Sequence, residues 1–380
     1  GRACMARSPA PAWHDLALPW GLRPGARGEP PRSAMARILG TRSRCGALAA
    51  LALLVAALPR CMVEVRPIRR VLVVGATHGN EATGVWVSQR IAHEPAIAER
   101  PSVRAVDTVI GNPRGYEETR RFVDLDLNRQ FGEEDLADLS LSSYEHQRAK
   151  VLNARFGPKN SPDPAADFVI DCHTTTSSMG ITLITEPWSQ VGFAAACWCQ
   201  QRLRRLFAGV DGGPEVHVVS ECFDKRSSPH LISMGREGLM IEVGPVPQGV
   251  LRSDVCTWTE KALGFVMDFL EGVNTGTLDD APKKATIFRD INVKVPVPSG
   301  SDGKPTAVFH HDFQGSDFRP LHKGDPIFTS VDGGTIAYDG SHGDVVWPAF
   351  VNEGAYYLPE SGLGFAIALQ EEVDVPTIKV

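Results

Sequence analysis

A histidine and a glutamate lie three residues apart in a glycine-rich turn that follows the first predicted strand. Residues 73–84 read VVGATHGNEATG, so His78 and Glu81 follow a run of apolar β-formers and precede a helical pattern. Turns of this kind often bind phosphate through backbone N–H groups. An imidazole and a carboxylate that face one point instead suggest a metal ion. We therefore take both residues as candidate metal ligands, although an isolated His-x-x-Glu pair is coincidental in most proteins.

Two further candidate groups lie in later strand patterns. His173 follows DFVIDC, and Glu242 lies in LMIEVG. Ligands of open α/β sheets bind beyond the C-terminal ends of the strands, so we expect these groups to meet. Two imidazoles and one carboxylate leave the fourth zinc position open for water, which is the ligand count of a catalytic zinc site. Glu242 is then the candidate general base, which passes the proton of water to a leaving amine.

The residues just before His173 have supporting roles in this interpretation. Asp171 could orient the imidazole of His173 by a hydrogen bond. Cys172 lies in an apolar strand pattern, so we expect a packed core thiol rather than a nucleophile.

Two arginines with neighbouring asparagines are candidates for substrate binding. Arg114 follows Asn112-Pro113, and Arg129 follows Asn128 in DLDLNRQF. A guanidinium group binds a carboxylate in a bidentate manner, and Asn128 can add an amide. The site would then hydrolyse an amide in a substrate that carries a free carboxylate. The alternative is that both arginines form surface ion pairs with nearby acidic residues.

The elements that must position these residues follow an alternating pattern. Strand patterns separated by helical patterns predict a mixed, mainly parallel sheet flanked by helices. The expected strands are 71–76, 102–111, 167–172, 180–186, 215–220 and 239–244, and the expected helices are 82–95, 143–156, 190–207 and 254–271. We expect a catalytic domain at 63–273, a linker at 274–282 and, from its short strands and Gly/Pro turns, a smaller β domain at 283–380.

Composition and charge narrow the class of protein. The net charge of -6 over 380 residues argues against a general nucleic-acid binder. The eight cysteines form no CxxC pair, which favours buried thiols in a reducing compartment. The spacing of Gly75, Gly79 and Gly84 does not fit GxGxxG, so a dinucleotide loop is disfavoured.

The first 62 residues do not read as part of a domain, and we expect them to be disordered. Basic residues precede an apolar run at 45–58 that is short for a membrane span, so no stable span is expected. The run suits organelle or secretory targeting through residues 35–61. Alternatively, this sequence never reaches the mature protein. Translation from Met62 would give a cytoplasmic enzyme.

Four other histidines are weaker candidates. His310, His311 and His322 could form a second metal site, but we interpret them as polar turn residues. His230 follows SSP in a predicted loop, so we expect a surface residue rather than a ligand.

Six segments resemble, in order and spacing, the aspartoacylase and aminoacylase-3 family, which is akin to the zinc carboxypeptidases and the succinylglutamate desuccinylases. The segments are GATHGNEATGV, NPRG, DLDLNRQF, DFVIDCHTTTSSMGITLI, IEVGPVPQGVLRSD and FVNEGAYY. The resemblance covers roughly residues 70–375 and implies a zinc carboxypeptidase-like fold. It implies one zinc ion per subunit, held by His78, Glu81 and His173, and a homodimer or higher homo-oligomer.

The resemblance also implies roles for other residues. Glu242 would be the general base and acid, and Arg114 would polarise the scissile carbonyl. Asn128 and Arg129 would hold the amino-acid carboxylate. Tyr356 would reach the same carboxylate from a C-terminal domain that covers the site. The implied substrates are small N-acyl amino acids, such as N-acetyl-aspartate or N-acetyl aromatic amino acids.

The sequence departs from the aspartoacylase pattern at three places. Ile232 stands where aspartoacylase has an arginine ten residues before the base, and YYLPES lacks a lysine after the paired tyrosines. These changes favour the aminoacylase-3 type, unless Lys225, Arg226 or Arg236 supplies the missing cation. Thr174 follows the zinc histidine where the family usually has asparagine. An inactive zinc-binding relative and a succinylglutamate desuccinylase-like activity stay open as alternatives.

Overall fold

The computed structural model describes residues 62–358 and 363–380, which belong to one compact unit. The strands are β1 (Met62–Glu64), β2 (Arg70–Gly75), β3 (Ala105–Ile110), β4 (Phe168–Thr174), β5 (Gly180–Thr185), β6 (Val216–Ser220), β7 (Glu237–Gly244), β8 (Lys284–Val295), β9 (Ala307–Phe309), β10 (Leu321–His322), β11 (Pro326–Ser330), β12 (Thr335–Ala337), β13 (Val345–Ala349), β14 (Phe365–Asp374) and β15 (Thr377–Lys379). The helices are α1 (Thr83–His93), α2 (Pro113–Glu117), α3 (Glu133–Ala137), α4 (Tyr144–Phe156), α5 (Gln190–Phe207) and α6 (Ser253–Thr275). The expectations for residues 1–62 lie, apart from Met62, outside the described residues.

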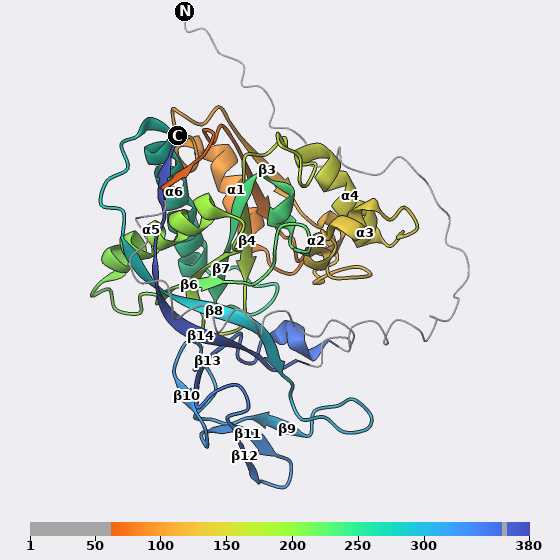
Figure 1. Ribbon diagram of the computed structural model, residues 1–380. Coiled ribbons are helices and arrows are strands. Elements are labelled where there is room, and N and C mark those ends of the chain that lie inside the picture. The colour runs from red at the N-terminus through yellow and green to blue at the C-terminus, as the bar shows by residue number, and fades with distance from the viewer. Residues whose placement is uncertain (1–61, 359–362) are drawn as a thin grey trace, which may run out of the picture. The chain divides into compact units, whose positions relative to one another are not determined.

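One large mixed sheet organises the molecule (Figure 1). Its ten strands within the described residues run in the order β10-β13-β14-β8-β6-β5-β7-β4-β2-β3. Every neighbouring pair from β3 to β8 is parallel except β5 and β7, whereas the pairs beyond β8 are antiparallel. The predicted fold class, a mainly parallel sheet flanked by helices with a smaller C-terminal β region, is confirmed.

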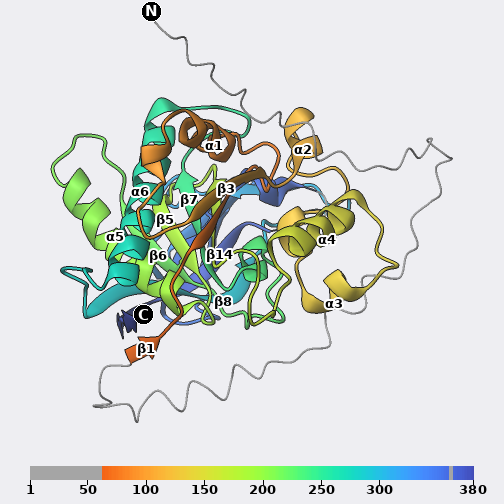
Figure 2. The same cartoon turned by 90° about the horizontal axis from the view of Figure 1, so that it is seen from above.

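The strands of this sheet carry apolar residues on both faces, as buried parallel strands require. On β2, Val71 and Val73 belong to the core on the side of α1, α5 and α6. Leu72 and Val74 belong to the core on the opposite side, which also contains Leu152 of α4. Seen from above, α5 and α6 lie on one side of the sheet and α3 and α4 on the other (Figure 2). The ends of the central strands therefore lie between two helical layers (Figure 2).

The C-terminal β region continues the main sheet. β8 pairs with β6 at Phe288 and Arg289, and with β14 over most of its length. β9, β11 and β12 form a separate three-stranded sheet, and β1 pairs with β15 near the C-terminus. The domain limits expected from the sequence, 63–273, 274–282 and 283–380, stay predictions, because the main sheet continues across the expected domain boundary. None of the helices in the described parts of the chain has the length and apolarity to cross a membrane.

Candidate metal and catalytic site

The glycines of the turn after β2 permit a close approach of three backbone segments. A Cβ atom on Gly84 would lie 2.7 Å from Gly75 Cα and 2.9 Å from Cys172 O, closer than side chains normally come. The start of α1 therefore packs directly on the ends of β2 and β4. This contact explains the glycines without a phosphate ligand, and it brings the turn that carries His78 and Glu81 beside His173.

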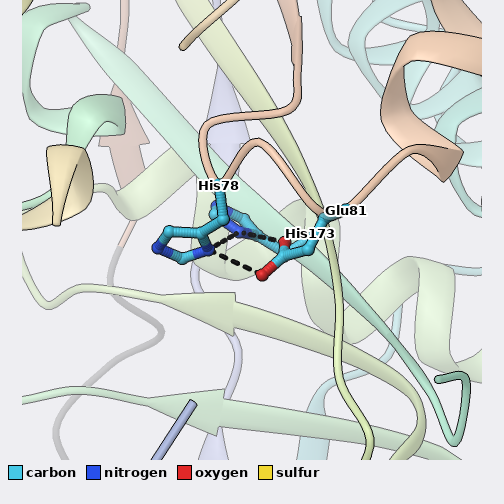
Figure 3. Close-up of side chains that lie close together, drawn as sticks. All are labelled: His78, Glu81 and His173. Atoms are coloured by element: carbon cyan, nitrogen blue, oxygen red, sulfur yellow. Dashed lines mark hydrogen bonds and ion pairs between the residues drawn. The ribbon is translucent and has the colours of Figure 1, made fainter. Parts of the chain in front are cut away.

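The three candidate ligands converge at this contact (Figure 3). His78 Nδ1 lies 2.7 Å from Glu81 Oε1, and His173 Nδ1 lies 3.0 Å from Glu81 Oε2. The two Nδ1 atoms are 3.2 Å apart, and all three side chains are buried. Two imidazole nitrogens and one carboxylate around one point are a donor set that suits zinc, so the residues present fit the ion that the sequence implies.

Carboxylates hold the far nitrogen of each imidazole. His78 Nε2 lies 3.0 Å from Asp126 Oδ1, and His173 Nε2 lies 2.8 Å from Asp171 Oδ2. Thr77 Oγ1 donates to the other oxygen of Asp171 at 2.6 Å. A proton held at Nε2 by a carboxylate leaves the Nδ1 lone pair for a metal. Asp171 thus has the contact that the sequence suggested, whereas the contact of Asp126 was not foreseen.

Opposite charges in this cluster stabilise each other's ionised forms. Burial alone would raise the pKa of Glu81, but the imidazoles of His78 and His173 lower it below its usual range. Burial likewise opposes the charge of His173, but Asp171 and Glu81 raise its pKa well above the usual value. The carboxylate of Glu81 is therefore ionised at neutral pH, which is the form that binds a metal.

The arginine at the cluster is Arg121. Its Nη1 lies 3.3 Å from Glu81 Oε1, and its Nη2 lies 3.0 Å from Asp126 Oδ2. The structure does not bring Arg114 to this point: it lies on α2, is half exposed, forms an ion pair with Glu118 at 3.6 Å and covers the ring of Tyr144. Arg121 was not identified from the sequence, because RR at 120–121 reads as an ordinary polar loop.

Glu242 lies next to His173 in the register of β7 and β4. It is 9% exposed, and no hydrogen bond from it is seen within the described residues. Burial, followed by the charge of Glu81, raises the pKa of Glu242 well above its usual value, although His173 opposes this. An unengaged carboxyl with a raised pKa beside a metal cluster is suited to proton transfer.

The segment with Asn128 and Arg129 lies against the same cluster. Asn128 is buried, with its Nδ2 3.5 Å from His173 Nε2 and its Oδ1 accepting from Leu231 N at 2.8 Å. Arg129 is exposed and, among the described residues, forms no ion pair; its Nη1 donates to Asn128 O at 2.8 Å. A guanidinium group without a protein carboxylate is available for a carboxylate of a ligand.

Two buried glutamates position these segments. Glu145 of α4 accepts from the backbone N–H groups of residues 123–125 and so fixes the approach to Asp126. Glu353 accepts from the hydroxyl of Thr175 and from Thr176 N at 2.8 Å, just after β4. This contact fixes the turn that carries Tyr356, whose pKa burial raises and the charges of Lys294 and Arg129 lower. Neither glutamate was identified from the sequence, because a lone acid gives no signal of burial.

Cys172, His230 and the histidine pair at 310–311 were also interpreted from the sequence. Cys172 is buried in the core, and burial raises the pKa of its thiol, as expected for a packing residue. The prediction that His230 is a surface residue is wrong: it is 4% exposed and contacts two carboxylates. His310 and His311 lie close to Asp312 in a turn, and His311 is largely exposed.

The fold is a mainly parallel α/β sheet and the site groups residues that could hold a metal ion, and comparison with known proteins gives the family. Residues 67–270 match the succinylglutamate desuccinylase/aspartoacylase catalytic domain, and residues 291–368 match the AstE/AspA barrel-sandwich hybrid domain. The chain belongs to the succinylglutamate desuccinylase/aspartoacylase family.

Individual relatives cover most of the chain. Aspartoacylase of Rattus norvegicus is 38% identical over 78% of this chain and 91% of its own length. The N-acyl-aromatic-L-amino acid amidohydrolase (carboxylate-forming) of Homo sapiens is 36% identical over 82% of this chain and 94% of its own. The crystal structure of murine aminoacylase 3 superposes with a TM-score of 0.72 at 30% identity, covering 82% of this chain and 98% of that one.

Proposed function

We propose that this protein is a zinc-dependent amidohydrolase that cleaves the acyl amide bond of N-acyl-L-amino acids and releases a carboxylate and a free amino acid. The observation that carries this proposal is the buried triad of His78, Glu81 and His173 with the unengaged carboxyl of Glu242 beside it. The names of the rat and human relatives describe hydrolases of this kind.

The triad would hold the metal, and Glu242 would move the proton. A bound zinc ion supplies a Lewis acid that polarises a carbonyl and lowers the pKa of water. Glu242 takes a proton from the water that attacks the carbonyl carbon. It returns this proton to the amide nitrogen as the C–N bond breaks, so that a neutral amine leaves.

Arg121 takes the electrostatic role that the sequence suggested for Arg114. Its guanidinium group is held at the cluster by Glu81 and Asp126, where negative charge would develop on the carbonyl oxygen. A preorganised cation at this point stabilises the transition state more than the ground state. Arg114, turned away on α2, has no such position.

The carboxylate of the substrate would bind at Arg129. This guanidinium group has no ion-pair partner among the described residues, and the amide of Asn128 and the hydroxyl of Tyr356 are the groups we assign to the same carboxylate. This arrangement restricts the substrate to one with a free carboxylate next to the amide. The homo-oligomeric state and the cytoplasmic location stay predictions.

Removal and return of the metal tests the proposal. The full chain should release acetate from N-acetyl-L-phenylalanine or N-acetyl-L-aspartate, lose this activity in a chelator, and regain it with one equivalent of zinc. Activity that persists without metal, or a zinc-loaded chain that cleaves no N-acyl amino acid, would contradict it.

A further inference from the structure

Three charged side chains that the proposed reaction does not use meet in the interior. Glu186 and Glu221 follow the ends of β5 and β6, and His230 precedes the 3₁₀-helix η6 (Leu231–Met234). His230 Nδ1 lies 2.7 Å from Glu186 Oε1 and 3.0 Å from Glu221 Oε2. We call these three residues the His230 cluster.

The two carboxylates of the His230 cluster are not equivalent. Glu186 is fully buried and also accepts from the hydroxyl of Ser228 at 2.8 Å and from the indole N–H of Trp188. Glu221 Oε2 is buried and, within the described structure, has no polar partner besides its ion pair with His230, although the side chain of Glu221 keeps 18% exposure. Glu186 therefore holds His230 in place, and Glu221 is the carboxylate with unused hydrogen-bonding capacity.

The imidazole of the His230 cluster faces two carboxylates. Burial alone would lower the pKa of His230, but Glu221 and Glu186 raise it to about 9. One imidazolium thus stands between two carboxylates, with Lys294 among the charges that act on Glu221 and Glu186 among those that act on Lys159.

The His230 cluster lies beside Asn128 and Arg129, which we assign to the carboxylate of the substrate. Leu231, next to His230, donates its N–H to Asn128 Oδ1 at 2.8 Å, and Phe131 N donates to Pro229 O at 3.1 Å. Hydrogen bonds on both sides of Arg129 thus join its segment to the loop with His230. Arg129 is also among the charges that act on Glu221, after burial and His230.

The other cations near this region have partners of their own. Lys294 Nζ lies 3.2 Å from Asp290, and Lys225 Nζ donates to two backbone carbonyl groups at 2.6 and 3.0 Å. Arg236 donates to a third carbonyl group, and Arg226 is largely exposed beside a surface glutamate. None of the three residues considered above as a replacement for the missing pocket arginine is therefore available to a second carboxylate of a substrate.

We propose that Glu221, anchored by His230 and Glu186, excludes N-acyl amino acids whose side chain carries a carboxylate, so that this protein acts on substrates with a single carboxylate. The inference rests on the proposed function and specifies its substrate class. The α-carboxylate of the substrate neutralises Arg129, and an acidic side chain would then face the carboxylate of Glu221. A side chain of the same size without charge meets no such opposition.

Two substrates of equal size separate charge from shape. For the zinc-loaded full chain, kcat/KM is measured with N-acetyl-L-asparagine and with N-acetyl-L-aspartate. We expect the asparagine compound to be preferred at least ten-fold. In Glu221→Gln this preference should fall at least five-fold, because the variant removes the charge and keeps the size. Glu372→Gln, which removes an exposed charge on β14, should leave the preference as in the wild type.

The outcomes distinguish the inference from the proposed function. Equal or better cleavage of the aspartate compound by the wild type overturns the inference, whether or not the variant folds. An unchanged preference in Glu221→Gln that unfolds at the wild-type temperature also overturns it. If the wild type cleaves neither compound, nor N-acetyl-L-phenylalanine, the proposed function fails and the inference fails with it.

Discussion

At the scale of single residues, the orientation of the two imidazoles depends on carboxylates outside the proposed metal-binding triad of His78, Glu81 and His173. Asp126 and Asp171 each face an Nε2 atom, and this leaves both Nδ1 atoms directed at Glu81. The triad alone would permit either ring nitrogen to face the metal. The two aspartates remove this freedom before a metal binds.

Asp126→Asn should weaken zinc binding while the chain stays folded. An amide can donate to Nε2 and so favours the ring form whose Nδ1 carries the proton. Contacts of this kind are typically worth about 10- to 100-fold in metal affinity. Competition with a chelator measures the change, and Asp107→Asn, at an exposed position on β3, is the control. A zinc affinity equal to that of the control would show that Asp126 does not orient His78.

A pair of arginine variants tests which guanidinium group serves the reaction. Arg121→Ala should lower kcat by about 10²- to 10³-fold, as the loss of a transition-state donor does. Arg114→Ala should change kcat by less than about two-fold, because Arg114 is held against Tyr144 and Glu118. Both variants are assayed after zinc content is confirmed. The reverse order of effects would restore the assignment made from the sequence.

The sequence predicted the residues at or just beyond the C-terminal ends of strands and missed those that depend on loop paths. His78, Glu81 and His173 lie together because parallel strands end at one edge of the sheet. Arg121 and Asp126 reach the same point only because Glu145 fixes the backbone of residues 123–125, and this long-range contact has no local signature. His230 was misjudged for the same reason.

At the scale of elements, the close approach of α1 to β2 and β4 sets the position of the turn that carries His78 and Glu81. Gly84→Ala would place a Cβ atom 2.7 Å from Gly75 Cα and 2.9 Å from Cys172 O. Because both neighbours are backbone, the elements must separate, which typically costs about 1–3 kcal/mol. The free energy of unfolding in denaturant should fall by this amount, and zinc affinity should fall with it.

Gly264→Ala is the matched control in a helix. A Cβ atom there meets nothing closer than 3.8 Å, so the substitution should raise the free energy of unfolding by about 0.5–1 kcal/mol. If Gly84→Ala were as stable as the wild type, the close contact would not position the site.

The longer elements follow from their hydrophobic periodicity, and the short ones do not. The helix expected at 190–207 has these bounds in the structure as α5. β1, with three residues, pairs with β15 at the far end of the chain. Such a strand exists through its partner, and a pattern of three residues is too short to predict it.

At the scale of the whole molecule, a buried histidine joins the central strands to the C-terminal β region. His217 of β6 lies 5.6 Å from the ring of Phe288 on β8 and 4.2 Å from that of Phe318, between centroids. Burial lowers the pKa of His217 to about 4, and Arg204 adds to this although Glu215 opposes it. The folded chain thus keeps this imidazole neutral where an unfolded chain would protonate it.

This histidine should make the fold sensitive to acid. Its pKa is lower in the folded state than the value near 6.5 of the unfolded chain, so its contribution is present above pH 6.5 and is lost as the pH falls towards 4. Between pH 7 and 5 the wild type should lose about 2 kcal/mol more unfolding free energy than His217→Phe. Denaturant unfolding at both pH values measures this, and equal losses would show that His217 does not cause the acid sensitivity.

The central claim is that a metal held by the triad and a proton carried by Glu242 together hydrolyse an N-acyl amino acid. The most direct test loads wild type and Glu242→Gln with zinc and measures both bound zinc and acetate release from N-acetyl-L-phenylalanine. We predict one zinc ion per chain in both proteins and a kcat about 10²- to 10⁴-fold lower in the variant. A zinc-loaded variant that turns over at a rate close to that of the wild type would contradict the account.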